Sequence, residues 1–109
     1  MKSYTDLEQS KKLTEILPLE SADMYYWHGS HRLLRVNDGK CEDIDILAWS
    51  LAALLEVLHE NKICHYNNRY YCQYMSEGDE FPIYSTAEYD NPIDACYEMI
   101  LKLHELKML

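Results

Sequence analysis

The sequence predicts one α+β domain, with three helices packed on a mainly antiparallel sheet of four to five strands. Two segments rich in strand-forming residues each contain a central turn signal, which predicts two hairpins. Segments with helical features stand before, between and after these hairpins. The order is therefore helix, two strands, helix, two or three strands, helix, which is typical of α+β domains. At 109 residues the chain has the length of a single domain, residues 1–109.

The first helix is predicted from Asp6 to Leu17. Thr5 and Glu8 fit a capping box, in which the Thr hydroxyl and the Glu side chain satisfy backbone N–H groups at the helix start. Pro18 follows directly and ends the helix, because proline cannot continue the backbone hydrogen bonding.

A first hairpin is predicted over Met24–Val36, because both ends of this segment are rich in aromatic and branched residues. Gly29-Ser30 suits a two-residue turn with glycine in first position, which sets His28 opposite His31. An acidic loop, Glu42–Asp45, follows this hairpin.

A central helix is predicted from Leu51 to about His59, with Ser50 as its N-cap. Its leucines form one stripe, and the segment contains very few polar residues. We therefore expect this helix to be buried along most of its circumference. Trp49 precedes the cap and is placed to pack against the start of the helix.

A second hairpin is predicted over Ile63–Met75. A short fifth strand follows at Phe81–Ser85. Pro82 lacks a backbone N–H, so this strand is expected at a sheet edge or with the proline at its beginning.

The turn of the second hairpin is predicted at Asn67-Asn68, since asparagine tolerates the positive φ angles of tight hairpin turns. A two-residue turn there places His65 opposite Tyr70 and Ile63 opposite Cys72.

The last twenty residues, Asp90–Leu109, predict one helix. Asn91 can cap it, Pro92 occupies the first helical position, and Asp94 lies in the first turn, where the helix dipole favours negative charge. Its apolar face consists of residues at helical spacing: Ile93, Cys96, Tyr97, Ile100 and Leu103.

The net charge of −9 is unevenly distributed, because no Lys, Arg or His occurs between Arg69 and Lys102. That stretch contains seven carboxylates: Glu77, Asp79, Glu80, Glu88, Asp90, Asp94 and Glu98. Such a field repels nucleic-acid phosphates, so we expect no nucleic-acid partner. Two interpretations remain: a solvated face that keeps the protein soluble, or an acidic surface for a basic protein that itself binds DNA.

The N-terminal segment has no apolar run of the kind found in signal peptides, and no apolar stretch reaches the ~20 residues needed to cross a bilayer. We therefore expect a cytoplasmic protein without a membrane partner. In that compartment the four cysteines are expected to be free thiols that behave as small buried hydrophobes: Cys41, Cys64, Cys72 and Cys96.

The histidines and cysteines do not predict a metal or a catalytic site. His28 and His31 lack the further ligands that a zinc site needs, and Cys64 and His65 point to opposite faces of a strand. We therefore expect no metal, no cofactor and no enzymatic activity. The alternative is a small-ligand-binding domain or minor enzyme that uses a cleft of His, Cys and carboxylate side chains.

Ten tyrosines are unusual for this length. Tyrosine and tryptophan serve in sheet packing, but they are also enriched at protein interfaces. We expect a non-enzymatic accessory protein that acts by protein–protein contact and forms a homodimer. The predicted contact residues are the aromatic residues of the two hairpins: Tyr25, Tyr26, Trp27, Tyr66, Tyr70, Tyr71 and Tyr74.

Three blocks, Glu8–Met24, Ala48–Leu58 and Asp90–Leu106, together carry a resemblance. With these blocks the chain resembles a group of short proteins encoded by prophages and other mobile elements of gut bacteria. The group has no known activity, so the resemblance implies no catalytic or binding residue. It implies a bacterial or phage cytoplasmic setting and a small accessory protein, so the alternative partner to a second copy of the chain is a host or phage protein.

Overall fold

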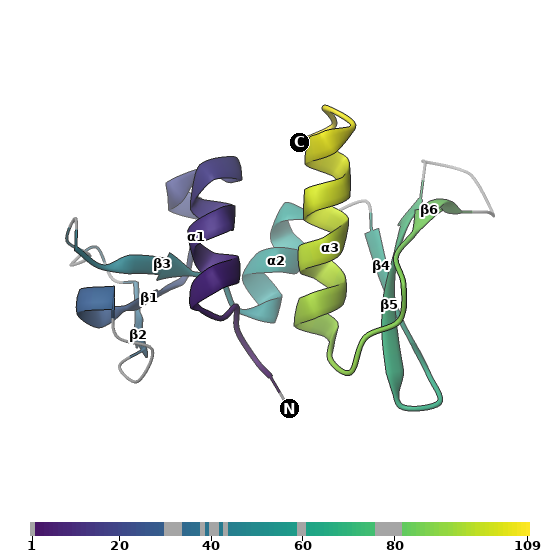
Figure 1. The fold of residues 1–109 in the computed structure, drawn as a ribbon, viewed down its shortest axis with the longest axis horizontal. Helices are drawn as coiled ribbons and strands as arrows, with labels where there is room; N and C mark the ends of the chain where they lie inside the picture. Colours follow the sequence, from purple (N-terminus) through teal and green to yellow (C-terminus); the bar gives the residue numbers. More distant parts are fainter. Residues whose placement is uncertain are drawn as a thin grey trace.

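The computed structural model describes residues 2–29, 34–37, 39, 42, 44–58, 61–75 and 82–109. Two three-stranded antiparallel sheets lie at opposite ends of the long axis, and the helices lie between them (Figure 1). The predicted α+β class with three helices is confirmed. The expectation of one sheet of four to five strands is wrong, because the strands divide into two separate sheets.

The first sheet consists of β1 (Met24–Tyr26), β2 (Leu34–Val36) and β3 (Ile46–Ala48), in the order β2-β1-β3. The predicted pairing of the first hairpin is present, with Met24 opposite Val36. The sequence did not predict β3, because three residues are too few to show the alternation of a strand. Its pairing with β1 completes the sheet.

The connection from β1 to β2 differs from the predicted two-residue turn. A short 3-10 segment, Trp27–Gly29, follows β1 directly, and His28 has a positive φ of 53°. His28 is therefore not part of a strand, and Tyr26 lies opposite Leu34. Ser30 and His31, the other residues of the predicted turn and histidine pair, lie outside the described residues.

The second sheet consists of β4 (Asn61–Tyr66), β5 (Arg69–Met75) and β6 (Pro82–Ser85), in the order β4-β5-β6. The hairpin prediction is confirmed in its register, since His65 lies opposite Tyr70 and Ile63 lies opposite Cys72. The turn residues Asn67 and Asn68 have φ angles of 50° and 61°.

The short last strand of this sheet was predicted at Phe81–Ser85. β6 is an edge strand that begins with Pro82, as the missing N–H of proline led us to expect. Phe81, its predicted first residue, lies outside the described residues.

Helix α1 (Leu7–Ile16) begins one residue later than predicted and has a different cap. Asp6 is the N-cap and forms the capping box with Gln9, rather than Thr5 with Glu8. Thr5 is instead fully buried, and its hydroxyl contacts the Ser10 hydroxyl and accepts a hydrogen bond from the Trp49 backbone N–H. A 3-10 turn, Leu19–Ser21, follows the helix.

Helix α2 (Leu51–Val57) has the predicted Ser50 cap, whose hydroxyl accepts from the Ala53 N–H. The expectation of burial around most of its circumference is wrong, because only Ala53 and Leu54 within it are buried. Leu55 is 37% exposed, so the helix packs by one face. His59, its predicted end, lies outside the described residues.

Helix α3 (Pro92–Glu105) has the predicted Asn91 cap and the predicted proline at its start. It ends before Leu109, and Lys107 has a positive φ of 60°. Of the five predicted apolar positions, all but the partly buried Tyr97 are buried: Ile93, Cys96, Ile100 and Leu103.

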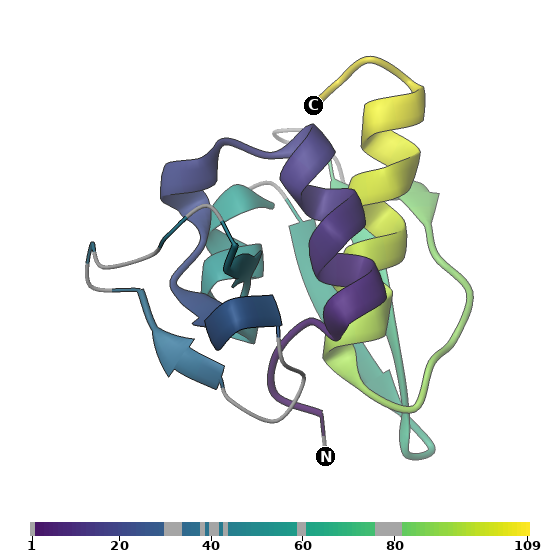
Figure 2. The same cartoon turned by 60° about the vertical axis from the view of Figure 1, so that its left-hand side comes forward.

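The core follows from these elements. α1 packs on β3, α3 packs on β5, and α2 packs on α3. The N-terminal ends of α1 and α3 lie side by side in Figure 2, as the hydrogen bond from Gln9 to Asp94 requires. The largest fully buried side chain is Trp49, whose indole N–H donates to the Ser21 hydroxyl at 2.9 Å. In the part of the chain that the structure describes, no helix is both long and apolar enough to cross a bilayer.

Candidate functional site

The second sheet has two very different faces. Its inner face packs on α3 and carries the fully buried Cys72 together with the partly buried Ile63, Tyr74 and Tyr84. In Figure 1 no described helix or strand lies on the other side of this sheet. We call that side the outer face; by strand alternation it comprises Lys62, Cys64, Tyr66, Arg69, Tyr71, Gln73, Ile83 and Ser85.

The tight turn of the hairpin fixes which side chains share the outer face. Two successive positive φ angles at Asn67 and Asn68 match the twist of the two flanking strands, so the hairpin closes without an extra residue. A slip by one residue would move Tyr66 to the opposite face. The Asn-Asn turn therefore keeps Tyr66 on the surface, where it is 66% exposed.

The outer face combines apolar and polar groups. Ile83 is 58% exposed, and Cys64 and Tyr71 lie opposite each other as half-buried neighbours. The Cys64 thiol hydrogen-bonds to the Gln73 side-chain oxygen at 3.5 Å. The neighbouring Cys64 raises the pKa of the Tyr71 hydroxyl above its ordinary value, and the charge of Glu88 adds to this shift.

The strands of the outer face contribute no negative charge of their own. None of the residues of β4, β5 and β6 is Asp or Glu, although the chain holds 19 carboxylates. Two residues that follow β6 border the face: the Asp90 carboxylate pairs with Arg69 at 2.5 Å, and the Glu88 carbonyl accepts a hydrogen bond from Arg69 at 2.9 Å. The strand surface itself therefore adds nothing to the excess negative charge that a partner meets.

The predicted contact residues divide between surface and interior. Tyr66 and Tyr71 lie on the outer face, whereas Tyr74 packs against the core. Tyr25 and Tyr26 are 4% and 3% exposed, so the prediction that they make intermolecular contacts is wrong. Tyr26 is covered by the N-terminal segment, since its ring lies edge to face with Tyr4 at 6.5 Å and its hydroxyl donates to the Thr5 carbonyl.

The other two predicted contact residues are already engaged within the chain. Trp27 is half-buried between two side chains, with the Arg35 guanidinium 4.4 Å from its ring centre and the His28 ring stacked at 4.0 Å. Tyr70 stacks on the His65 ring at 4.3 Å, on the side of the sheet opposite the outer face.

The predicted acidic surface is partly neutralised. Asp90 pairs with Arg69, and Asp94 pairs with Lys2 at 2.8 Å. Two of its four described carboxylates are therefore bound to cations from distant parts of the chain. Glu88 and Glu98 are the other two, and Glu77, Asp79 and Glu80 lie outside the described residues.

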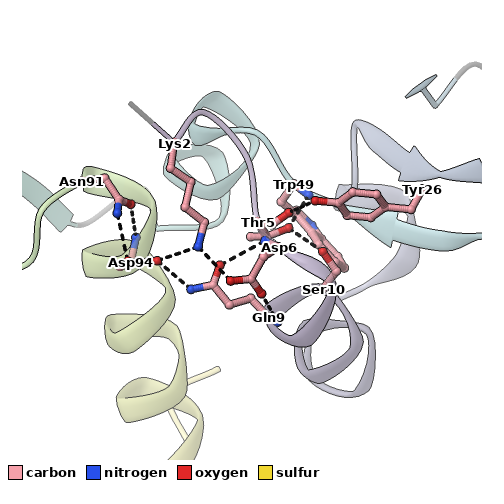
Figure 3. A network of polar contacts seen from close by, with 9 residues as sticks. All are labelled: Lys2, Thr5, Asp6, Gln9, Ser10, Tyr26, Trp49, Asn91 and Asp94. Carbon is pink, nitrogen blue, oxygen red and sulfur yellow. Dashed lines mark hydrogen bonds and ion pairs between the residues drawn. The ribbon is translucent and has the colours of Figure 1, made fainter. Parts of the chain in front are cut away.

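Asp94 belongs to a polar network that joins the two halves of the molecule (Figure 3). Its carboxylate accepts hydrogen bonds from Lys2, from the Gln9 amide and from the Asn91 amide. Partial burial by itself would raise the pKa of the Asp94 carboxyl, but these donors lower it below its ordinary value. Lys2 also pairs with Asp6, the cap of α1.

The same network continues into the first sheet. The Tyr26 hydroxyl donates to the Thr5 carbonyl at 2.6 Å, in the segment that leads into α1 (Figure 3). Burial raises the pKa of the Tyr26 hydroxyl, which stays neutral and keeps this bond at physiological pH. The N-terminal segment thus connects α3 to β1 through polar contacts.

The histidines and cysteines that the structure describes are not assembled into one site. Cys72 of β5 and Cys96 of α3 are both fully buried, and the Cys72 thiol donates to the Asn61 side-chain oxygen at 3.7 Å. The His28 N–H donates to Asp45, far along the chain from these thiols. Within the described ranges no group of three His, Cys, Asp or Glu side chains could hold a metal ion. Cys41 lies outside those ranges.

A cavity of about 570 Å³ opens between α1 and the first sheet. Leu19, Ile46 and Leu47 give it an apolar lining, and Glu20, Glu42, Asp45 and Lys11 supply charged groups. Hydrogen bonds from the Glu42 and His28 backbone N–H groups lower the pKa of the Asp45 carboxyl. Asp45 is thus fixed as an anion beside an apolar wall.

A scan of protein-family models, a search of curated proteins and a search of solved structures each find no match to this chain. The resemblance to prophage-encoded proteins therefore stays a prediction. The outer face and the cavity are the two features of the described residues that bear on function.

Sequence reasoning found Tyr66 and Tyr71 but did not separate them from Tyr70 and Tyr74. The information was present: the predicted register already placed Cys72 and Ile63 side by side. An apolar closing helix needs an apolar sheet face, and alternation from Cys72 then assigns Tyr71 to the other face. Ile83 was missed because its neighbours Pro82 and Tyr84 obscure any alternation in so short a strand.

Proposed function

We propose that this protein is a small accessory module that acts by protein–protein contact rather than by catalysis, and that it self-associates through its second sheet. The observation that carries this proposal is the outer face. It is uncovered by any described element, carries the exposed Tyr66 and Ile83, and is built from strands that contain no carboxylate in a chain of net charge −9. Aromatic residues on such a face are the usual anchors of an interface.

The contact expected of this sheet is with another copy of the chain. Two copies of so acidic a protein repel each other at most orientations, and the sheet whose strands contain no carboxylate offers the approach with the least repulsion. Raising the salt concentration should therefore strengthen the dimer, because it screens the remaining repulsion.

The experiment is light scattering at several protein concentrations and at low and high salt. We expect a dimer, and Tyr66→Ser should raise its dissociation constant about tenfold, as loss of a moderate anchor does. The matched control is Val36→Ser, since Val36 is equally exposed at 68% but lies on the first sheet. A monomer at all concentrations, or equal effects of both substitutions, would contradict the proposal.

A second candidate function, binding of a small ligand, is favoured by the cavity beside the first sheet. An apolar wall with three carboxylates and one lysine fits a small apolar molecule that carries a positive charge. We expect benzylamine to bind more tightly than benzoate in a calorimetric titration, and Glu20→Gln to weaken benzylamine. Equal binding of both molecules, or none of either, would exclude this candidate.

A further inference from the structure

The open edge of β4 offers backbone groups for pairing with a further strand. β4 pairs only with β5, so one of its two edges faces away from the sheet. On β5, the backbone groups of Tyr70 and Cys72 point toward Tyr89 and Thr86, on the side away from β4. In an antiparallel ladder opposite residues both point toward each other or both away. The N–H and C=O groups of Ile63 and His65 therefore point to the open edge.

Within the described chain, no hydrogen bond occupies these groups of Ile63 and His65. Asn61, the next residue with the same orientation, differs because its N–H already donates to the Leu58 carbonyl at 2.8 Å. On the other side Asn67 has the positive φ of the turn and cannot extend a strand. The usable edge is thus limited to residues 62–66.

We propose that two copies of the chain pair antiparallel through β4, with Cys64 of each copy at the two-fold axis, to form one continuous sheet from the two second sheets. This proposal rests on the proposed function, since it specifies how the self-association occurs. The register follows from the usable edge. A two-fold axis at Cys64 places Ile63 opposite His65 of the other copy, so that all four outward groups find partners.

Neighbouring registers leave outward backbone groups without an available partner. An axis at Ile63 would require the N–H of Asn61, which Leu58 already uses. An axis at His65 would place Ile63 opposite Asn67 in the turn. Only the axis at Cys64 pairs each outward group with an available one.

The side chains are compatible with this register. On the outer face Lys62 lies opposite Tyr66 of the other copy, so the ammonium meets an aromatic ring rather than a second cation. β4 contains no proline and no carboxylate. The Cys64 side chains of the two copies lie opposite each other in a pair without mutual backbone hydrogen bonds, where Cα atoms approach to about 4.5 Å.

This proximity supplies the test. Copper(II)-phenanthroline in air should remove two electrons and two protons from two Cys64 thiols and join the copies by a disulfide. On a non-reducing gel we expect a covalent dimer from the wild-type chain and from Cys72→Ser, whose sulfur is buried in the core. Cys64→Ser should give none.

A second variant tests the backbone pairing itself. His65→Pro removes an N–H that faces the open edge and none that pairs with β5, whereas His65→Ala keeps it. Light scattering should show loss of the dimer for the proline variant only, with circular dichroism to verify its folding. A dimer that neither cross-links at Cys64 nor responds to His65→Pro would overturn the edge register but leave self-association intact. A wild-type monomer would overturn both.

Discussion

The two sheets contain tyrosines in similar hairpins and use them in opposite ways. In the first sheet Tyr25 and Tyr26 are buried, and the Tyr26 hydroxyl is hydrogen-bonded to the Thr5 carbonyl in the segment that leads into α1. In the second sheet Tyr66 and Tyr71 lie on a face that no described element covers. The difference lies in what packs on each sheet, so residue type alone does not tell an interior tyrosine from a contact tyrosine.

Replacing one tyrosine by alanine in each sheet should give the largest difference in the free energy of unfolding. Tyr26→Ala should lower the free energy of unfolding by about 3–5 kcal/mol, because it removes a buried ring and a hydrogen bond. Tyr66→Ala should change it by less than about 0.5 kcal/mol, because that side chain is exposed. Urea denaturation at low protein concentration measures both. Similar losses for the two variants would contradict the assignment of Tyr66 to the surface.

A smaller difference in stability is expected between the ion pairs of Asp94 with Lys2 and of Asp90 with Arg69. Asp94→Asn should lower the free energy of unfolding by about 1–2 kcal/mol. The Asp94 carboxylate is two-thirds covered and accepts hydrogen bonds from both halves of the molecule. Asp90→Asn should lower the free energy of unfolding by less than about 0.5 kcal/mol, since the Asp90 side chain is 85% exposed. Urea midpoints of the two variants measure the contrast, and a larger loss for Asp90→Asn would show that the network does not join the halves.

The Asp94 carboxylate should also make the stability of the protein depend on pH. The pKa of Asp94 is lower in the folded protein than its ordinary 3.8, so its contribution is present above that value and disappears as the pH falls through the folded pKa. Wild type should therefore lose more stability between pH 6 and pH 3 than Asp94→Asn. Urea midpoints across that range measure the difference; parallel curves would indicate that Asp94 is not responsible.

The smallest effect concerns the turn that orients the second sheet. Asn68 has a φ of 61°, which glycine adopts without strain. Asn68→Gly should stabilise the protein by about 0.5 kcal/mol and Asn68→Ala should destabilise it by about 1 kcal/mol. Thermal melting measures both changes. The opposite order would mean that the hairpin does not use this turn.

The sequence predicted well those elements that are determined by residues within the element itself. The Asn67-Asn68 turn and the Asn91-Pro92 helix start are determined by the φ preferences and side-chain oxygens of the residues themselves. The strand β3 and the separation into two sheets depend on which distant segments meet, and no local pattern encodes that. The same holds for the site, since both Tyr26 and Tyr66 were predicted as contacts and only the contact of Tyr26 with the N-terminal segment distinguishes them.

The contact between Lys2 and Asp94 has a consequence for synthesis. The ribosome produces α1 early and α3 late, yet the carboxylate that receives Lys2 and Gln9 lies in the first turn of α3. The first helix therefore cannot complete its contacts until nearly the whole chain has emerged. Such distant contacts slow folding relative to local ones, because the intervening loop must close first. The packing of α1 on β3 can thus form early, whereas the contacts of Lys2 and Gln9 with Asp94 form only after α3 has emerged.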